Sequence, residues 1–424
     1  EVNNSIIEKD DYYLMGDLIG KQGVEISYEE ELRGIKGIKF IQKDRFNRDV
    51  GSFKNGDIDI IPIAGKDLTI TIDSELQDYG EQLMNGKKGG IVAIDPRNGE
   101  ILSLVSAPSY NPNLLIGRNR SENYMELYRD SIYKPLIDKS LLNMHAPGSP
   151  FKILVGLSAL QENVISEKTT IYCNNYYQYG KEKRTMQCHC GGGHRNLTNA
   201  ISLSCNSYFA NAYRKTIDTK SPTKEAFNNW SNQMKSFGLG EYLNNDLSVG
   251  KKGIIPDFEF YNKWYPDFKW GATTTLSNSI GQGEVLVTPI QLANMTAAIA
   301  NKGYYYTPHI IKKIEGSEID SKFKTKNYTL IDSTHFEPII KGLSKVYKSG
   351  TAQFLQVPEI EICGKTGTAE NFTKINGKKT QLTDHSIFVA FAPKDNPTIA
   401  ISVLVENGYY GSRSVSYTHL TLPT

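Results

Sequence analysis

The prediction of the fold depends on one short stretch, Pro147-Gly148-Ser149-Pro150-Phe151-Lys152. Proline is favoured in the first turn of a helix, because its missing N–H would have no partner there. We therefore expect Ser149 to lie at the mouth of a helix. Lys152 follows three residues later, and this spacing puts the two side chains on one helical face, about 5 to 6 Å apart at Cβ. A lysine whose pKa is lowered by burial can activate a serine nucleophile.

The Ser-x-x-Lys pattern is weak by itself, because it also occurs at Ser131/Lys134, Ser221/Lys224, Ser248/Lys251 and Ser321/Lys324. Two later motifs distinguish Ser149. Ser204-Cys205-Asn206 follows in a helical region, and Lys365-Thr366-Gly367-Thr368 lies on a predicted strand. Taken singly, the second motif reads as a helix cap and the third as a strand end with a turn glycine. Three motifs in this order, however, are a specific signal for serine acyl transfer.

The composition excludes several classes of protein. The 424 residues are 39% hydrophobic and 22% charged, with a net charge of +2, which is ordinary for a globular chain. Near-neutral charge gives no broad basic field for nucleic acid. No uncharged apolar run reaches the roughly 18 to 20 residues that cross a bilayer. The length predicts one large domain and a smaller one.

Strand patterns occur near both ends of the larger domain, with helical patterns between them. Residues 68–72, 90–94 and 101–105 read as strands, and strands return at 386–391 and 398–405. The helical stretches are 74–85, 152–162, 197–216 and 289–301. We therefore expect a sheet whose strands come from both halves of the chain.

On these motifs, residues 15–413 resemble the class B penicillin-binding proteins, most closely the elongation-type penicillin-binding protein 2. Further stretches that carry the resemblance are Gly20–Gly34, Tyr110–Asn113, Ile280–Glu284, Thr288–Ala293, Gly350–Ala352 and Gly364–Glu370. The resemblance implies an α/β (α+β) penicillin-binding transpeptidase fold, with an antiparallel five-stranded sheet flanked by helices and an all-helical subdomain. It also implies a remnant of an N-terminal pedestal (dimerisation-like) domain at residues 1–62 and a transpeptidase domain at 63–414.

The ends of the sequence lead to further expectations. The chain opens at Glu1 without a methionine, so we expect an upstream segment. The resemblance implies that this segment carries one transmembrane helix, anchored in the inner membrane with the catalytic domain in the periplasm. Residues 415–424 resemble the translation of a sequencing adapter. We expect that these ten residues do not belong to the protein, and that a closing C-terminal helix is absent.

The resemblance implies a serine-type D-Ala-D-Ala transpeptidase. Ser149 would attack the penultimate D-Ala carbonyl of a peptidoglycan stem peptide, and the amine of a second stem would then take the acyl group. Lys152 is the expected base. Ser204 would relay a proton to the leaving amine, and Asn206 would hold Lys152 and the substrate amide.

The third motif would bind the substrate. Lys365 and Thr366 would contact its terminal carboxylate, a charge-assisted bond. Gly367 would leave the strand edge open for the extended peptide, which could pair there as an added strand. The oxyanion hole would use the backbone N–H groups of Ser149 and Thr368, and such donors are worth roughly 3 to 4 kcal/mol each in acyl transfer.

The partners implied by the resemblance are peptidoglycan stem peptides, β-lactams, a SEDS-type glycan polymerase and the scaffold proteins of the elongation complex, without nucleic acid. Three alternatives stay open. One is a division-type class B protein, against which the pedestal segment and residues 199–213 favour the elongation type only moderately. A β-lactamase would need a deacylating base, for which Glu241 is the nearest match. A penicillin-sensor domain would acylate without turnover, but would lack the pedestal segment.

The last expectation is a metal site. Four of the five cysteines fall within one segment that also contains His189 and His194. Thiolates and imidazoles are the ligands that structural Zn²⁺ prefers. By the spacing of zinc-carrying relatives, the predicted ligands are Cys173, Cys188, His194 and Cys205, with Cys190 and His189 in reserve. A Cys173–Cys188 disulfide and free thiols are the alternatives.

Overall fold

The computed structural model describes residues 4–218, 223–266, 270–355, 358–375 and 377–409. Its contacts divide the chain into two compact units. The first comprises Glu1–Thr71, Asn245–Val249 and His309–Ser321, and the second comprises Ile72–Asn244, Gly250–Pro308 and Lys322–Thr424. The predicted domain boundary lay at residue 62, whereas the first unit continues to Thr71. The predicted adapter segment, 415–424, lies outside the described residues.

Strand pairing within the first unit explains why it continues past residue 62. Strand β3 (Leu68–Ile70) pairs with β11 (Ile311–Ile314), far along the chain. The Asp246 carboxylate accepts hydrogen bonds from Tyr28 Oη, at 2.8 Å, and from the N–H of Ile310. The remaining elements of this unit are α1 (Asn4–Ile7), α2 (Gly23–Ser27), α3 (Glu29–Leu32), β1 (Ile41–Lys43), β2 (Asp49–Ser52) and η1 (Phe53–Gly56).

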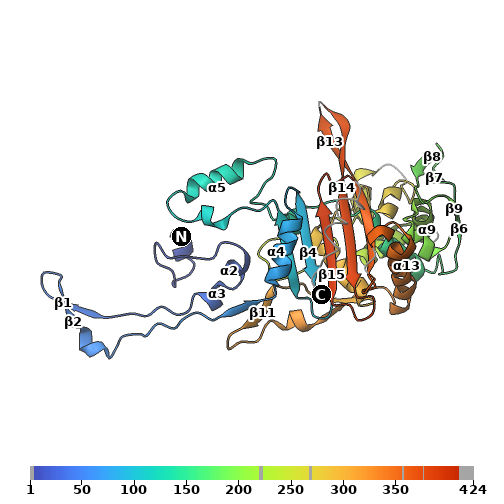
Figure 1. Ribbon diagram of the computed structural model, residues 1–424. Helices are drawn as coiled ribbons and strands as arrows, with labels where there is room; N and C mark the ends of the chain where they lie inside the picture. Colours follow the sequence, from blue (N-terminus) through green and yellow to red (C-terminus); the bar gives the residue numbers. More distant parts are fainter. Residues whose placement is uncertain (1–3, 219–222, 267–269, 356–357, 376, 410–424) are drawn as a thin grey trace. The chain divides into compact units, whose positions relative to one another are not determined.

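An antiparallel sheet of five strands forms the centre of the second unit, as predicted (Figure 1). The strand order is β13-β14-β15-β4-β5. The bounds are β4 (Gly89–Ile94), β5 (Ile101–Ala107), β13 (Cys363–Ile375), β14 (Lys378–Ala392) and β15 (Ile399–Val405). Two strands come from early in the sequence and three from its end, so β13, which carries the third motif, is an edge strand.

Helices cover both faces of this sheet. On one face, α4 (Ser74–Leu83) places Gly80 against Val105, and α13 (Phe336–Ser349) places Tyr347 against Phe388. On the other face, α12 (Pro289–Ala300) packs against β15 and β4. Helix α12 is buried along its whole length, which its almost entirely apolar sequence requires. Strand β4 is likewise buried on both faces.

A largely helical region separates the two sets of strands. Its helices are α7 (Lys152–Gln161), α8 (Leu197–Ser202), α9 (Asn206–Asp218), α10 (Thr223–Lys235) and α11 (Phe258–Trp264). Phe151, Tyr213 and Phe227 pack around the buried Trp230 in its core. The family resemblance implied an all-helical subdomain, but this region also contains two small two-stranded sheets. These are β6 (Ile171–Cys173) with β9 (Gly193–Arg195), and β7 (Tyr176–Tyr179) with β8 (Arg184–Gln187).

Short elements complete the second unit. They are η2 (Pro112–Leu115), α5 (Arg120–Arg129), α6 (Lys139–Leu142), η3 (Ser149–Phe151), η4 (Leu276–Ile280), β10 (Tyr304–Tyr306), β12 (Lys326–Tyr328), η6 (Ser333–His335) and η7 (Gln353–Leu355). Between β11 and β12 lies η5 (Ser321–Lys324). Among the described helices, none has both the length and the apolar character needed to cross a bilayer.

Candidate active site

The first motif forms the turn that opens a helix, as the sequence predicts. Ser149 begins η3 and Lys152 begins α7 directly after it. Gly148 precedes them with φ +59°, a conformation that L side chains rarely adopt. A Cβ at Gly148 would also lie 2.8 Å from the carbonyl oxygen of Thr368. The glycine therefore allows the turn that carries the nucleophile to approach strand β13.

The second motif lies at a break between helices, where the sequence predicted a continuous helix over 197–216. Helix α8 ends at Ser202 and α9 begins at Asn206. Ser204 adopts the left-handed conformation, with φ +55°, which is uncommon for a residue other than glycine. Its Oγ donates a hydrogen bond to Ser149 Oγ at 3.0 Å. The break, which helical periodicity does not reveal, thus brings the two hydroxyl groups together.

Lys152 is buried beside these hydroxyl groups. Its Nζ donates hydrogen bonds to Ser204 Oγ at 3.0 Å, to the Ser204 carbonyl oxygen at 2.9 Å and to Asn206 Oδ1 at 2.5 Å. Burial lowers the pKa of Lys152 to about 8, although negative charge on the nearby cysteine sulfurs opposes this shift. With this pKa, a substantial fraction of the Lys152 amine is neutral near physiological pH, and this amine must be neutral to accept a proton as a general base. Ser204 Oγ therefore links this base to the Ser149 hydroxyl.

The third motif lies on the edge strand next to the nucleophile. Lys365 is fully buried, and its Nζ donates to the carbonyl oxygen of Thr366 at 3.0 Å. Burial, together with the charge of Lys152, holds the pKa of Lys365 well below its usual value. A Cβ at Gly367 would come within 2.4 Å of Cδ of Pro150. Gly367 therefore makes room for the turn that bears Ser149, in addition to its predicted place at the strand edge.

Contacts that the sequence did not assign connect these motifs to other loops. Gln282 Nε2 donates to the carbonyl oxygen of Thr368 at 3.2 Å. Thr351 Oγ1 lies 3.0 Å from Oγ1 of Thr366. Asn206 Nδ2 donates to the carbonyl oxygen of Gln187 at 2.7 Å, so the β7–β8 sheet borders the second motif. The stretches around residues 282 and 351 were recognised by resemblance, but their roles depend on contacts between distant segments.

Four buried cysteines converge beside the second motif. The sulfurs of Cys173, Cys188, Cys190 and Cys205 all lie within 4.8 Å of one another, and none of them is in a disulfide. Two of the separations are 3.7 Å, between Cys188 and Cys205, and 3.5 Å, between Cys190 and Cys173. Four sulfurs about 2.3 Å from a zinc ion, arranged as a tetrahedron, would lie about 3.8 Å apart. The four thiols therefore fit such an ion.

The predicted ligand His194 lies outside this cluster, and Cys190 lies inside it. Strand β9 pairs with β6 so that His194 is opposite Tyr172, and the two rings contact at 4.9 Å. Because side chains alternate along a strand, this register places His194 on the face opposite to Cys173. His194 is exposed, as is His189. The structure therefore brings together four cysteines, and not the predicted set of three cysteines and His194.

Electrostatics and hydrogen bonds couple the cluster to the catalytic motif. The sulfurs of Cys188 and Cys205 are hydrogen-bonded at 3.7 Å, and this contact lowers the pKa of the Cys188 thiol and raises that of the Cys205 thiol. The backbone N–H of Asn206 donates to Cys188 Sγ at 3.1 Å. Cys205 itself lies between Ser204 and Asn206 in sequence. The position of the second motif is therefore tied to the cluster.

Comparison with known families agrees with this geometry. The family model described as the penicillin-binding protein transpeptidase domain matches residues 89–418, which is more than half of the chain. The chain belongs to this family. A model of the penicillin-binding protein dimerisation domain also matches residues 2–70. The predicted family and fold are thus confirmed.

Curated relatives of the chain include peptidoglycan D,D-transpeptidases MrdA. The chain is 34% identical to that of Acinetobacter baumannii over 95% of its own length and 59% of the relative's. It is 32% identical to that of Escherichia coli over 93% of its length and 62% of the relative's. The chain therefore spans about three fifths of the length of these relatives.

Solved structures of penicillin-binding protein 2 are also similar to the chain. One is Pseudomonas aeruginosa PBP2 in complex with WCK 5153, with a TM-score of 0.80, 32% identity, and coverage of 98% of this chain and 84% of that one. Another is PBP2 from Helicobacter pylori in complex with MreC, with a TM-score of 0.79, 28% identity and coverage of 97% and 73%.

Proposed function

We propose that this chain is the catalytic part of an elongation-type peptidoglycan D,D-transpeptidase that works through an acyl-enzyme on Ser149. The observation that carries the proposal is the position of Ser204 Oγ, which is 3.0 Å from both Lys152 Nζ and Ser149 Oγ. This connected path joins a buried base to a half-buried hydroxyl group, which is the arrangement of an activated serine nucleophile. The similarity to MrdA proteins supports the choice of reaction.

In the proposed acylation step, Ser149 Oγ attacks the carbonyl carbon of the penultimate D-Ala. Its proton passes through Ser204 Oγ to neutral Lys152. The C–N bond to the terminal D-Ala then breaks, and the leaving amine takes that proton back along the same path. In the second step, the amine of another stem peptide attacks the ester carbonyl and gives a proton to Lys152. The new amide forms, and Ser149 recovers its proton.

Strand β13 is the proposed binding edge for the donor peptide, which would add to the sheet as a further strand. Its carboxylate would lie near Lys365, Thr366 and Thr368, where the negative charge of the bound substrate would favour the protonated form of the buried Lys365. The backbone N–H groups of Ser149 and Thr368 remain the proposed oxyanion donors. The close approach of Gly148 to Thr368 supports this pairing.

The partners and the location are proposed from the relatives. One similar structure is described as a complex of PBP2 with MreC, and another as a peptidoglycan synthase complex that coordinates polymerization and crosslinking. We infer that this protein likewise binds a scaffold protein and a SEDS-type glycan polymerase. We also infer an anchor in the inner membrane and a periplasmic catalytic domain. Co-purification of the full-length protein with each partner tests this inference.

We also propose a structural Zn²⁺ ion bound by Cys173, Cys188, Cys190 and Cys205. When bound, it would supply a tetrahedral cross-link between β6, the β8–β9 loop and the start of α9. The separations between the sulfurs support this ligand set. The consequence for this chain is that Ser204 and Asn206 would be held in place beside Lys152.

One experiment separates the proposed activity from its alternatives. The protein is mixed with labelled penicillin in stopped flow and then assayed with donor and acceptor stem peptides. A long-lived adduct together with peptide cross-linking supports the proposal. Rapid release of penicilloate would indicate a β-lactamase, and an adduct without cross-linking would indicate a sensor. The candidate β-lactamase base, Glu241, is exposed, whereas Lys152 is buried beside Ser204, which favours the transpeptidase.

A further inference from the structure

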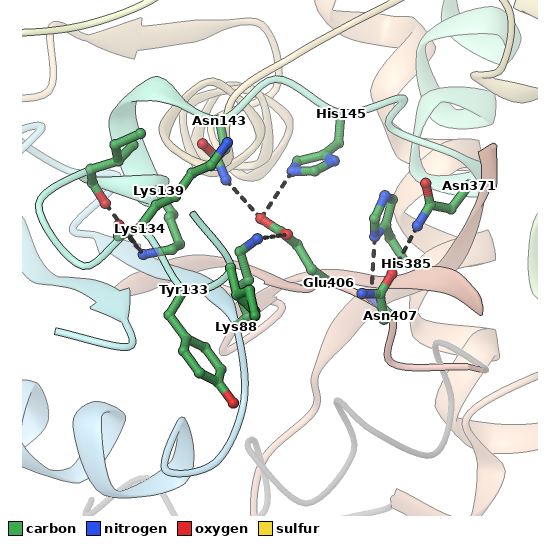
Figure 2. A network of polar contacts seen from close by, with 12 residues as sticks. Lys88, Tyr133, Lys134, Lys139, Asn143, His145, Asn371, His385, Glu406 and Asn407 are labelled. Carbon is green, nitrogen blue, oxygen red and sulfur yellow. Dashed lines mark hydrogen bonds and ion pairs between the residues drawn. The ribbon is translucent and has the colours of Figure 1, made fainter. Parts of the chain in front are cut away.

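A buried carboxylate outside the three motifs joins the segment that leads to Ser149 to the end of the central sheet. Glu406 follows β15 directly, and its side chain is 9% exposed. Its Oε1 accepts a hydrogen bond from Asn143 Nδ2 at 2.7 Å, and its Oε2 lies 2.9 Å from Lys88 Nζ (Figure 2). His145 Nε2 lies 3.6 Å from Oε1 and has no hydrogen-bond partner among the described residues.

The carboxylate is held at the point where two central strands meet. The Glu406 backbone N–H donates to the carbonyl oxygen of Lys88 at 2.6 Å, immediately before β4. Burial by itself would raise the pKa of Glu406, but contacts with His145 and Lys88 outweigh it and lower the pKa to about 2. The group is therefore ionised at neutral pH, and its position is set by the rigid ends of β15 and β4.

A second set of contacts extends from His145 toward β13. The rings of His145 and His385 pack edge to face at 4.6 Å. His385 Nδ1 accepts from the Asn407 N–H at 3.2 Å, and Asn407 Oδ1 accepts from Asn371 Nδ2 at 2.8 Å (Figure 2). His385 pairs across the sheet with Ala369, the residue after the third motif. The contacts of Glu406 thus lie between residues 143–149, which lead to Ser149, and strand β13, the proposed substrate-binding strand.

An open pocket borders the segment that leads to Ser149. A cavity of about 300 Å³ lies beside it, lined in part by Lys139, Asn143, His145 and Glu406. On its other side, the backbone of His145 exchanges two hydrogen bonds of 2.9 Å with Val287. The segment is therefore held by polar contacts on both sides, with empty space next to the Glu406 contacts.

We propose that Glu406 is a positioning residue for the acyl transfer, because its carboxylate holds Asn143 and His145 and thereby sets the distance between Ser149 and strand β13. Ser149 follows His145 by four residues. The intervening Gly148 is in close contact with Thr368, so a small shift of the segment changes the geometry at the nucleophile. Misplacement of a reacting group by about 1 Å can slow a reaction about 100-fold. This inference rests on the proposed function.

The test is the change Glu406→Gln, which keeps the size of the side chain and removes its charge. Stopped flow with a fluorescent penicillin separates the dissociation constant of the initial complex from the acylation rate constant. We expect the acylation rate constant to fall about 10- to 100-fold, with the dissociation constant nearly unchanged. Asn143→Ala should lower the acylation rate constant less than Glu406→Gln does. In the double variant the fold-decrease should be smaller than the product of the two single fold-decreases, because both changes remove the same hydrogen bond between Asn143 and Glu406.

Glu361→Gln is the matched control. The pKa of Glu361 is also lowered to about 2, by hydrogen bonds from Lys348 and Ser344, and among the described residues its side chain makes no hydrogen bond or ion pair with the Asn143–His145 segment. Its acylation rate constant should equal that of the wild type. An unchanged rate constant in folded Glu406→Gln, or an equal loss in Glu361→Gln, would overturn the proposal.

Hydrogen exchange separates failure of this proposal from failure of the proposed function. If the wild-type protein does not acylate, the proposed function fails, and the positioning role is read from the amides of His145 and Gly148. Both amides donate to backbone carbonyl groups, those of Val287 and Gly281. Glu406→Gln should speed exchange at these two amides, and Glu361→Gln should not. Equal exchange in all three proteins would contradict the role of Glu406.

Discussion

At the scale of single residues, the side chains named by the three motifs are the ones that meet in the structure. Ser149, Lys152, Ser204 and Asn206 form one connected set of hydrogen bonds. Serine and lysine spaced by three residues occur elsewhere in the chain without such surroundings; Ser131, for example, is exposed. What distinguishes the pair Ser149 and Lys152 is the burial of the lysine, which lowers its pKa.

The first prediction concerns the nucleophile. Ser149→Ala should abolish covalent labelling by a fluorescent penicillin, because no other hydroxyl group lies at the end of the path from Lys152. Labelling is measured on denaturing gels after a fixed time. Ser131→Ala is the control and should label like the wild type. Full labelling of folded Ser149→Ala would refute the assignment.

The second prediction concerns the base. With a pKa of about 8, Lys152 is mostly protonated at pH 6 and mostly neutral at pH 9, and only the neutral amine can accept the Ser149 proton. The second-order rate constant for acylation should therefore rise with pH and be half-maximal near pH 8. Lys152→Ala should lower the rate by several orders of magnitude. A rate constant that is flat from pH 6 to 9 would show that another group is the base.

At the scale of elements, the active site depends on where helices stop and which strand lies at the edge. The sequence pattern predicted a helix over 197–216, and the structure ends it at Ser202 and restarts it at Asn206. Apolar periodicity continues across this break, so the pattern alone could not reveal it. The left-handed Ser204 is stabilised by contacts with Lys152 and Ser149, which are distant in sequence.

The third prediction tests the approach of the nucleophile turn to β13. Gly367→Ala would place a methyl group within 2.4 Å of Pro150, so either the turn or the strand must move. We expect slower acylation and a loss of about 1 to 3 kcal/mol of unfolding free energy, as for overpacking elsewhere. Gly250→Ala is the matched control, because a methyl group there meets nothing within 4 Å. If Gly367→Ala acylated at the wild-type rate, a tight fit between strand β13 and the turn that carries Ser149 would be excluded.

At the scale of the whole molecule, residues far apart in the sequence are brought together around the site. The central sheet combines strands from residues 89–107 with strands from 363–405. The thiol cluster joins β6, the β8–β9 loop and the residue before α9. Both arrangements support the second motif or the third, so the stability of the fold and the geometry of the site are connected.

The fourth prediction concerns the proposed metal. Purified protein should contain about one zinc ion per chain, and Cys188→Ser should lose the ion, lower the melting temperature and slow acylation, since binding to the folded state adds to stability. Metal analysis, thiol titration and thermal unfolding measure these effects. Cys363→Ser is the control, because Cys363 is buried but lies outside the cluster. A metal-free protein with a mapped disulfide would end the proposal.

The sequence alone was sufficient to recognise the family through three motifs in a fixed order and to predict strands in both halves of the chain, and the five-stranded sheet was implied by the resemblance to that family. These features depend on local patterns, namely strand alternation, a helix-opening turn and short motifs whose residue types the chemistry requires. The break at Ser204, the presence of Cys190 rather than His194 in the thiol cluster and the contacts of Glu406 were decided only by tertiary structure. Each depends on the register of a strand or on contacts between segments many residues apart, and no local pattern records such contacts.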